Sequence, residues 1–374
     1  MRSLAVVISV FGTCFGQPSD RSVLPLSIPF ELVSNQILVK VGVNSSAPTW
    51  FVLDTGASSC VVDTALARKL GLKTEGEKQG KGAGKGSVKF SILKGAVYNL
   101  PRWDTPVDES YVIDLSGQPA LLGRYIGGIL GYGFFAPYVV DVDFDARVIT
   151  IYQPDHYQPN GESVPFKLIK HTPHIHVKLT VAGRPPIDLE ALVDSGSQDA
   201  IDADALGQSP QRLEVIGGVG LGQEFRTVLA RADSLQIGSF TLPHPFGVTG
   251  GVALIGNEIW RRFHVAFDYP HARIFLSPGQ HFSDPFLLDA SGLDMRWTAG
   301  FASFEVHDVS KDSPGWVAGI RSQDTIVAIN GQPASAFAME QVAQLLTETG
   351  REIWLKVKRG TTTQDIKLSL RARL

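Results

Sequence analysis

Short apolar segments rich in Val, Ile and Phe, separated by Gly, Pro and polar residues, dominate the chain up to about residue 280. Segments of this kind are typical of β-strands, and long amphipathic helices are scarce in the same region. In "HTPHIHVKL" (171–179) polar residues His174, His176 and Lys178 alternate with apolar ones, so the two sets lie on opposite faces of a strand. The pattern predicts a mainly β fold.

The same order of features occurs twice before residue 280. "SIPFELVSNQILVKVGV" begins at residue 27 and "SVPFKLIKHTPHIHVKLTV" at residue 163, and each leads into an acidic turn, "FVLDTGASSCVVD" or "ALVDSGSQDAID". A short helix signal, a Gly-rich stretch, an apolar pair before Gly ("ILG" at 129–131, "LIG" at 254–256) and a strand pair follow in both copies. Such a repeat predicts a duplicated β-rich lobe, at 24–158 and 159–279, with a pseudo-twofold axis between the copies.

Each acidic turn is followed by a helix signal with its own capping residue. Asp63 is expected to cap "TALARKLG", with Gly71 closing that helix, and Asp202 is expected to cap "ADAL".

Length and composition agree with several globular domains. The 374 residues predict two or three domains, and 44% hydrophobic with 19% charged residues excludes a disordered chain. A formal net charge of −3 without polybasic runs indicates neither a nucleic-acid partner nor an anionic membrane surface.

The two acidic turns predict a pair of facing carboxylates. Equivalent residues of a duplicated lobe lie opposite each other, so Asp54 and Asp194 are expected to meet. Thr55 and Ser195 then offer hydroxyls that hydrogen-bond across to the other lobe. After them, glycine lets the backbone turn sharply and brings amides close to the carboxylate, at Gly56 and Gly196.

Two carboxylates held this close cannot both ionise, and they share one proton over a wide pH range. The ionised Asp removes a proton from a water that attacks an amide carbonyl, while the protonated Asp donates to the carbonyl oxygen. This chemistry needs no metal and no cofactor. The pair His174 and His176 beside Lys178 is interpreted as a solvated face, because no carboxylate or Cys at a matching spacing completes a metal site.

On these motifs, residues 24–279 resemble the two-lobed, pepsin-like aspartic proteases, with "DTGA" wording closer to the retroviral-type (retropepsin-like) branch. The resemblance implies two β-barrel lobes, a catalytic dyad of Asp54 and Asp194 complete within one chain, and a hydroxyl grip formed by Thr55 and Ser195. It also implies that 129–131 and 254–256 pack beneath the two aspartates. The alternative for each Asp is a turn or cap residue.

The residue after each D-T/S-G motif differs between the lobes. It is Ala57 in the first lobe and Ser197 in the second, whereas many pepsin-like enzymes carry hydroxyls at both places. Since a donated hydroxyl favours the charged carboxylate, Asp194 is predicted to be the more acidic member and Asp54 to hold the proton. Activity is then expected to persist closer to neutral pH.

The Gly-rich stretches lie where the resembled family has its flap, a hairpin over bound peptide. In "GKGAGKG" the flap assignment rests on Gly82, Gly84 and Gly86, whose freedom suits a mobile lid. A dinucleotide loop is disfavoured, because the following "SVKFSILKGAVY" reads as strand.

After a linker at 280–288, residues 289–374 resemble a PDZ domain. The resemblance rests on Ser313-Pro314, Ala318-Gly319-Ile320, Asp324-Thr325-Ile326, Ile329-Asn330-Gly331, a helix near 337–347 and a final strand "EIWLKVKR". It implies a groove that accepts a peptide as an added strand, with a carboxylate loop at 292–295 including Leu293 and Met295, and with Met339 at the helix start. Asp294 stands where Gly is usual, which opposes binding of a free C-terminus. A purely structural PDZ domain is the alternative.

The N-terminal segment has the layout of a secretory signal peptide. Arg2 precedes an apolar run and small residues, so cleavage after Gly16 (signal peptide 1–16) and export to the periplasm or outside the cell are expected. A buried strand is the alternative, and a lipid anchor at Cys14 is disfavoured because Phe-Gly-Thr is a poor lipobox.

The sequence therefore predicts an exported, bacterial-type aspartic endopeptidase that acts on peptides or unfolded proteins, with a PDZ domain for peptide binding or regulation; its oligomeric state is left open. A non-catalytic peptide-binding scaffold is the second interpretation. A trypsin-like Ser-His-Asp protease with a PDZ domain is excluded, because no Gly-Asn/Asp-Ser-Gly nucleophile turn is present.

Overall fold

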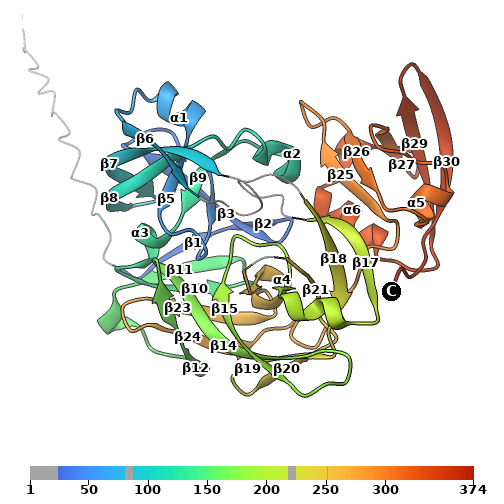
Figure 1. Ribbon diagram of the computed structural model, residues 1–374. Helices are drawn as coiled ribbons and strands as arrows, with labels where there is room; N and C mark the ends of the chain where they lie inside the picture. The colour runs from blue at the N-terminus through green and yellow to red at the C-terminus, as the bar shows by residue number, and fades with distance from the viewer. Residues whose placement is uncertain (1–23, 81–86, 218–224, 251) are drawn as a thin grey trace, which may run out of the picture.

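The computed structural model describes residues 24–80, 87–217, 225–250 and 252–374. The predicted signal peptide at 1–16, Cys14 and the flap glycines Gly82, Gly84 and Gly86 lie outside these residues. Strands predominate, as the sequence predicts, and form two lobes, a sheet shared by the lobes, and a C-terminal domain (Figure 1).

The first lobe is a closed β-barrel. Its strands run in the order β2 (Glu31–Val33), β3 (Gln36–Val43), β4 (Thr49–Leu53), β9 (Ile126–Leu130), β5 (Cys60–Asp63), β8 (Trp103–Ile113), β7 (Val88–Leu100) and β6 (Glu75–Gly80). An additional pairing between β3 and β7 closes the sheet on itself. Three short helices complete the lobe, α1 (Thr64–Lys69), α2 (Gln118–Leu122) and α3 (Tyr132–Phe135).

The second lobe repeats the central pairings. Its strands run in the order β17 (Arg212–Gly217), β18 (Phe225–Arg231), β21 (Phe246–Val248), β16 (Ile201–Asp202), β22 (Leu254–Ile255), β15 (Ile187–Val193), β14 (Thr172–Thr180), β19 (Ser234–Ile237) and β20 (Phe240–Pro243), with β13 (Lys167–Ile169) on β14. The strand before each acidic turn pairs in parallel with the strand of its apolar pair, β4 with β9 and β15 with β22. The pseudo-twofold relation of the whole lobes stays a prediction.

The two lobes share one sheet and one hydrophobic core. The shared sheet has the order β1 (Leu26–Pro29), β11 (Val148–Tyr152), β10 (Val139–Asp143), β23 (Phe263–Asp268), β24 (Arg273–Pro278) and β12 (Glu162–Pro165). At its centre β10 pairs with β23 from the other half of the sequence. There His264 bonds Asp141, and this carboxylate raises the pKa of the imidazole. Buried residues from both lobes form a continuous cluster, so the lobes are braced against each other.

The helix predictions had different outcomes in the two lobes. Asp63 caps α1 by accepting from Ala65 N and Leu66 N, and Gly71 follows the helix with φ +64°. The Asp202 prediction is wrong, because Asp202 still belongs to strand β16. The 3₁₀-helix η2 (Asp204–Gln208) begins later and has Ala203 at its N-cap. Burial instead raises the pKa of Asp202 to about 7.

The C-terminal domain has a separate core and a sheet in the order β25 (Leu293–Trp297), β26 (Phe304–Val309), β27 (Thr325–Ile329), β29 (Glu352–Arg359) and β30 (Thr362–Ser369), with β28 (Gln332–Pro333) on β27. Its helices are α5 (Pro314–Val317) and α6 (Met339–Leu346), within the predicted 337–347. The domain also contains the short 3₁₀-helix η3 (Ala334–Ala336). Two further short elements, η1 (Pro154–His156) and α4 (Asn257–Trp260), lie before the C-terminal domain.

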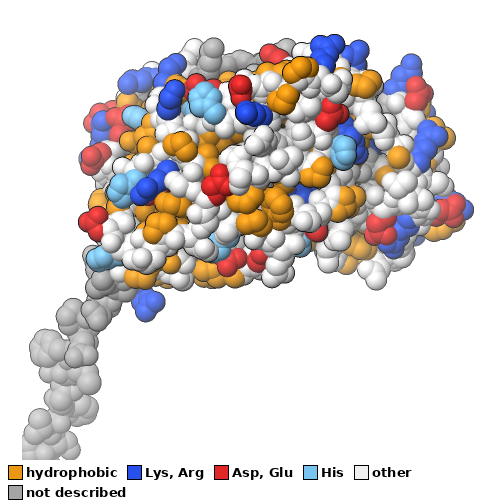
Figure 2. Space-filling view, turned by 90° about the horizontal axis from the view of Figure 1, so that it is seen from below, with side chains coloured by type: hydrophobic (Ala, Val, Ile, Leu, Met, Phe, Trp, Pro, Cys, Tyr) orange, Lys and Arg blue, Asp and Glu red, His pale blue; other side chains and the backbone are white. Residues whose placement is uncertain are grey.

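This domain packs against the first lobe along β25. Helix α2 lies between the two (Figure 1), and Trp297 of β25 lies so close to Gly123 that a Cβ there would be 2.5 Å from its Nε1. Lys/Arg and Asp/Glu side chains are interspersed on the face shown in Figure 2. Among the described residues, none of the helices has the length and apolarity needed to cross a bilayer.

Candidate active site

Each acidic turn begins where a buried strand ends. Leu53 and Val193, the last residues of β4 and β15, are fully buried. The next residue in each lobe is held by the strand of the apolar pair: Asp54 N donates to Leu130 O at 3.0 Å, and Asp194 N donates to Ile255 O at 2.9 Å. The two aspartates therefore start from the same local structure, as their repeated sequence predicts.

Thr55 and Ser195 form a reciprocal set of hydrogen bonds between the lobes. Thr55 Oγ1 donates to Val193 O at 2.6 Å and accepts from Ser195 N at 2.9 Å. Ser195 Oγ donates to Leu53 O at 2.9 Å and accepts from Thr55 N at 2.9 Å. Both hydroxyl residues are completely buried, so every group in this set is satisfied inside the protein. The predicted hydroxyl grip is therefore present in the structure.

The carboxyl groups of Asp54 and Asp194 face each other across this set of bonds. A Cβ added to Gly56 would lie 2.7 Å from the Asp194 carboxyl, and one added to Gly196 would lie 2.4 Å from the Asp54 carboxyl carbon. Neither glycine has a positive φ. Glycine is needed at both positions because a Cβ would collide with the opposite carboxyl. The sharp turn expected from the sequence does not account for the two glycines.

Backbone amides hold one oxygen of each carboxylate. Gly56 N donates to Asp54 Oδ1 at 2.8 Å, and Gly196 N donates to Asp194 Oδ1 at 2.9 Å. Asp194 Oδ1 also accepts from Ser197 N at 3.1 Å. The Ala57 amide likewise lowers the pKa of Asp54, so each turn directs the amides of its glycine and of the next residue at its carboxylate.

The surroundings shift the two carboxyls unequally. Both side chains are partly accessible to solvent, but protein encloses them on most sides. This desolvation, followed by the charge of Asp194, raises the pKa of Asp54 well above its usual range. Desolvation also raises the pKa of Asp194, while the amide of Gly196, the hydrogen bond from Asp54 and the amide of Ser197 lower it. These directions are those of a pair that shares one proton, with the stronger upward shift on Asp54.

The predicted proton assignment thus agrees with these pKa directions, but the predicted reason is different. The Ser197 hydroxyl accepts from Asp199 N at 3.3 Å, and the group of Ser197 that donates to Asp194 is its backbone amide. The amides of Ala57 and Ser197 also each donate to the main-chain oxygen of their own aspartate at 3.3 Å. The unequal pKa directions therefore do not come from the Ser197 hydroxyl. The charge of Asp194 and the hydrogen bond between the two carboxyls separate the pair.

The two apolar pairs lie directly beneath the turns. A Cβ on Gly131 would lie 2.3 Å from Ser59 O, and one on Gly256 would lie 2.3 Å from Asp199 O. Both glycines are therefore required for the strand to pass under the turn.

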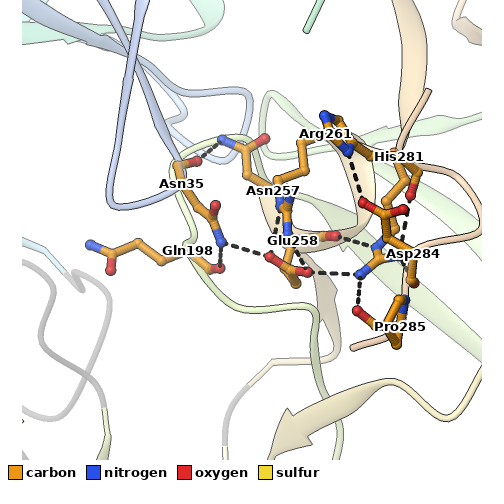
Figure 3. Close-up of polar contacts among 9 residues, drawn as sticks. Asn35, Gln198, Asn257, Glu258, Arg261, His281, Asp284 and Pro285 are labelled. Carbon is orange, nitrogen blue, oxygen red and sulfur yellow. Dashed lines mark hydrogen bonds and ion pairs between the residues drawn. The ribbon is translucent and has the colours of Figure 1, made fainter. Parts of the chain in front are cut away.

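Behind each turn the lobes meet at a second junction, which the sequence did not reveal. In the first lobe Tyr132 follows the apolar pair and stacks on His171 of the other lobe, with ring centres 4.3 Å apart. At the equivalent place Asn257 Nδ2 donates to Asn35 O at 2.7 Å (Figure 3). The same Nδ2 donates to Ser195 O at 2.6 Å. The register of the repeat aligns Tyr132 with Asn257, and this alignment was the available signal.

The predicted peptide-binding residues lie on the first strand and the helix of the C-terminal domain. β25 forms one edge of the sheet, and Met295 and Met339 are partly buried against the domain core. Leu293 is buried in that core. At the expected carboxylate loop, Gly292 N already donates to Asp289 Oδ2 and Leu293 N to Ser291 Oγ. With Asp294 also present, the loop is poorly suited to a free C-terminus.

Comparison with protein families agrees with this geometry. Residues 39–134 match the family model of aspartyl proteases. Residues 305–359 match that of the PDZ domain. The aspartyl protease match contains the first acidic turn and its apolar pair, and together the two matches confirm the resemblance inferred from the sequence. No curated protein matches the chain.

The hydroxyl grip of this aspartyl protease-like pair of lobes gives a first test. Thr55→Val keeps the shape of the side chain but leaves Ser195 N and Val193 O without their buried partner, which costs about 2–4 kcal/mol in the free energy of unfolding. Thr55→Ser keeps the hydroxyl and is the matched control. Urea unfolding of both variants measures the difference; equal stability of Thr55→Val and Thr55→Ser would contradict the role of the hydroxyl.

Proposed function

We propose that the protein is an aspartic endopeptidase that hydrolyses peptide bonds with a water activated between Asp54 and Asp194. The observation that carries the proposal is the face-to-face placement of two carboxyls, each against the glycine of the opposite turn. The aspartyl protease match over 39–134 supports it. Two carboxyls that served only to close their turns would gain no stability from lying this close, because burial and mutual repulsion disfavour their charged forms.

The unequal carboxyls divide the acid and base roles. Asp194, held ionised by two amides, takes a proton from the water as its oxygen attacks the scissile carbonyl carbon. Asp54 donates its proton to the carbonyl oxygen, which gives a tetrahedral diol. Asp194 then passes its proton to the amide nitrogen as the C–N bond breaks, and a diol hydroxyl returns a proton to Asp54. One proton is on the dyad before and after the cycle.

The C-terminal domain is proposed to bind peptide segments. The PDZ match supports peptide binding, and the edge strand β25 with helix α6 is the place where an added strand would lie. The commitment of loop amides to Asp289 and Ser291 favours internal segments over free C-termini. Export through a cleaved segment at 1–16 and a bacterial source also remain proposals.

Substitution of either aspartate tests the proposal. Asp54→Asn and Asp194→Asn each remove one of the acid–base groups, so cleavage of an unfolded protein should fall by at least about 100-fold. Asp188→Asn, at an exposed position on the strand that leads to Asp194, is the matched control and should cleave as wild type does.

Two outcomes oppose this proposal. Cleavage that survives either dyad substitution would exclude the mechanism. Peptide binding without cleavage by the wild-type protein at any pH from acidic to neutral would favour the non-catalytic scaffold.

The unequal pair also predicts a pH dependence. Activity should persist toward neutral pH and fall as the pH rises through the raised pKa of Asp54, where the proton donor is lost. In Ala57→Ser an added hydroxyl can donate to Asp54 and favour its charged form, which lowers this pKa. The high-pH limb of the rate profile should therefore move to lower pH.

Ser197→Ala is the control for this profile, because it removes a hydroxyl that bonds Asp199 N and keeps the amide that bonds Asp194. Its low-pH limb should stay in place. A high-pH limb that does not move in Ala57→Ser, or that moves upward, would count against Asp54 as the proton donor.

A further inference from the structure

Three side-chain amides converge on the turn that follows Asp194. Asn257 Nδ2 donates to Ser195 O at 2.6 Å, Gln36 Nε2 donates to Gly196 O at 2.5 Å, and Asn35 Nδ2 donates to Gln198 O at 3.1 Å. Two of the three donors come from the first lobe. Figure 3 shows Asn35 between Gln198, Asn257 and Glu258.

We propose that Asn35, Gln36 and Asn257 are positioning residues, an amide clamp by which the first lobe holds the catalytic turn of the second. The proposal rests on the dyad function proposed above and adds residues that act through Asp194 without touching substrate.

The planarity of the peptide group explains how the clamp reaches Asp194. The carbonyl of Ser195 and the amide of Gly196 belong to one rigid peptide unit, so a bond to Ser195 O also sets the direction of Gly196 N–H. In the same way the bond to Gly196 O sets the direction of Ser197 N–H. These two N–H groups are the ones that donate to Asp194 Oδ1. The clamp therefore orients both donors that favour the ionised carboxylate.

The orientation of the clamp amides supports a positioning role. Among the described residues, Gln36 Oε1 and Asn257 Oδ1 are buried without a hydrogen-bond partner, and Asn257 is completely buried. Leaving an amide oxygen unpaired is unfavourable. The arrangement uses the nitrogen of each side chain on the catalytic turn even though its oxygen is left unsatisfied.

The first turn is held differently. There Thr55 O accepts from the Tyr269 hydroxyl at 3.3 Å, a longer bond than those of Gln36 and Asn257. The residue equivalent to Asn257 is Tyr132, which stacks on His171. The amide clamp is thus specific to the lobe that carries the ionised aspartate.

The PDZ domain braces the clamp from outside. Ser34 N, next to Asn35 in the β2–β3 turn, donates to Glu340 Oε1 at the start of α6. On the other side, Asn35 Nδ2 bonds Glu258 Oε2 at 2.9 Å, and Glu258 Oε1 bonds Arg262. Arg262 is almost completely buried and donates to the main-chain oxygen of Asp284, in the linker before the PDZ domain.

Gln36→Ala and Asn257→Ala test the clamp in the full-length protein. Each should lower kcat about 10- to 100-fold, the usual size of a small misplacement near the reacting groups, and leave KM within about twofold. Fewer aligned donors favour the protonated form of Asp194, so the low-pH limb of the rate profile should move to higher pH. Gln236→Ala removes a similar amide–carbonyl bond, to Gly238 O, and should match wild type.

Hydrogen exchange of the backbone measures the clamp without relying on activity. The Gly196 and Ser197 amides should exchange at least about 10-fold faster in both variants, as expected for a segment that opens locally more often, and at the wild-type rate in Gln236→Ala. Wild-type exchange in this turn together with an unmoved low-pH limb would overturn the clamp. If the variants exchange faster than the wild type but none of these proteins, the wild type included, cleaves peptides, the clamp stands and the proposed function is rejected. Gln36 is only half-buried, so its variant covers the case in which Asn257→Ala fails to fold.

The brace has its own matched pair. Glu340→Gln keeps an oxygen acceptor for Ser34 N and should retain wild-type kcat, whereas Glu340→Ala should lower kcat and raise exchange in the turn, less than Gln36→Ala does. Glu348→Ala, at an exposed ion pair with Arg351, is the control within the same domain. If Glu340→Ala and Glu340→Gln behave alike, the PDZ domain does not brace the clamp.

Discussion

The structure depends on the buried reciprocal bonds of Thr55 and Ser195. These bonds join the ends of two buried strands from different lobes. The side chains of Asp54 and Asp194, which directly follow these strands, then point at the other lobe. Because both hydroxyls are excluded from water, separating the lobes would expose or strand several polar groups at once. The shared sheet and the common core supply the bulk of the association, but these bonds determine how closely the carboxyls approach.

The two halves of the site are alike in backbone and different in support. Each aspartate follows a buried strand, lies above an apolar pair and accepts from the amide of its glycine. The second turn adds three side-chain amides that fix its peptide groups. Under the proposed function, this unequal support would set which aspartate donates its proton and which accepts one.

The repeat in the sequence predicted the features that depend on local pattern. The strand before each Asp and the α1 cap at Asp63 both follow from periodicity and turn chemistry. The cap at Asp202 failed because Asp202 pairs with Val248 and Leu254 in the sheet, so tertiary pairing overrode a local signal. The amide clamp was beyond prediction, since Asn35 and Gln36 look like ordinary turn residues and bond the second turn across 163 and 160 positions of chain. Contacts of that kind depend on the docking of the lobes.

The central claim is that two facing carboxyls share one proton, held mainly on Asp54. Selective carbon-13 labelling of aspartate side-chain carboxyls, with the two signals assigned through Asp54→Asn and Asp194→Asn, measures this directly by NMR titration. The account predicts that the Asp54 signal stays protonated well above the usual aspartate range of about 3.5–4, while Asp194 ionises at lower pH. Independent titration of both carboxyls within that usual range would contradict it.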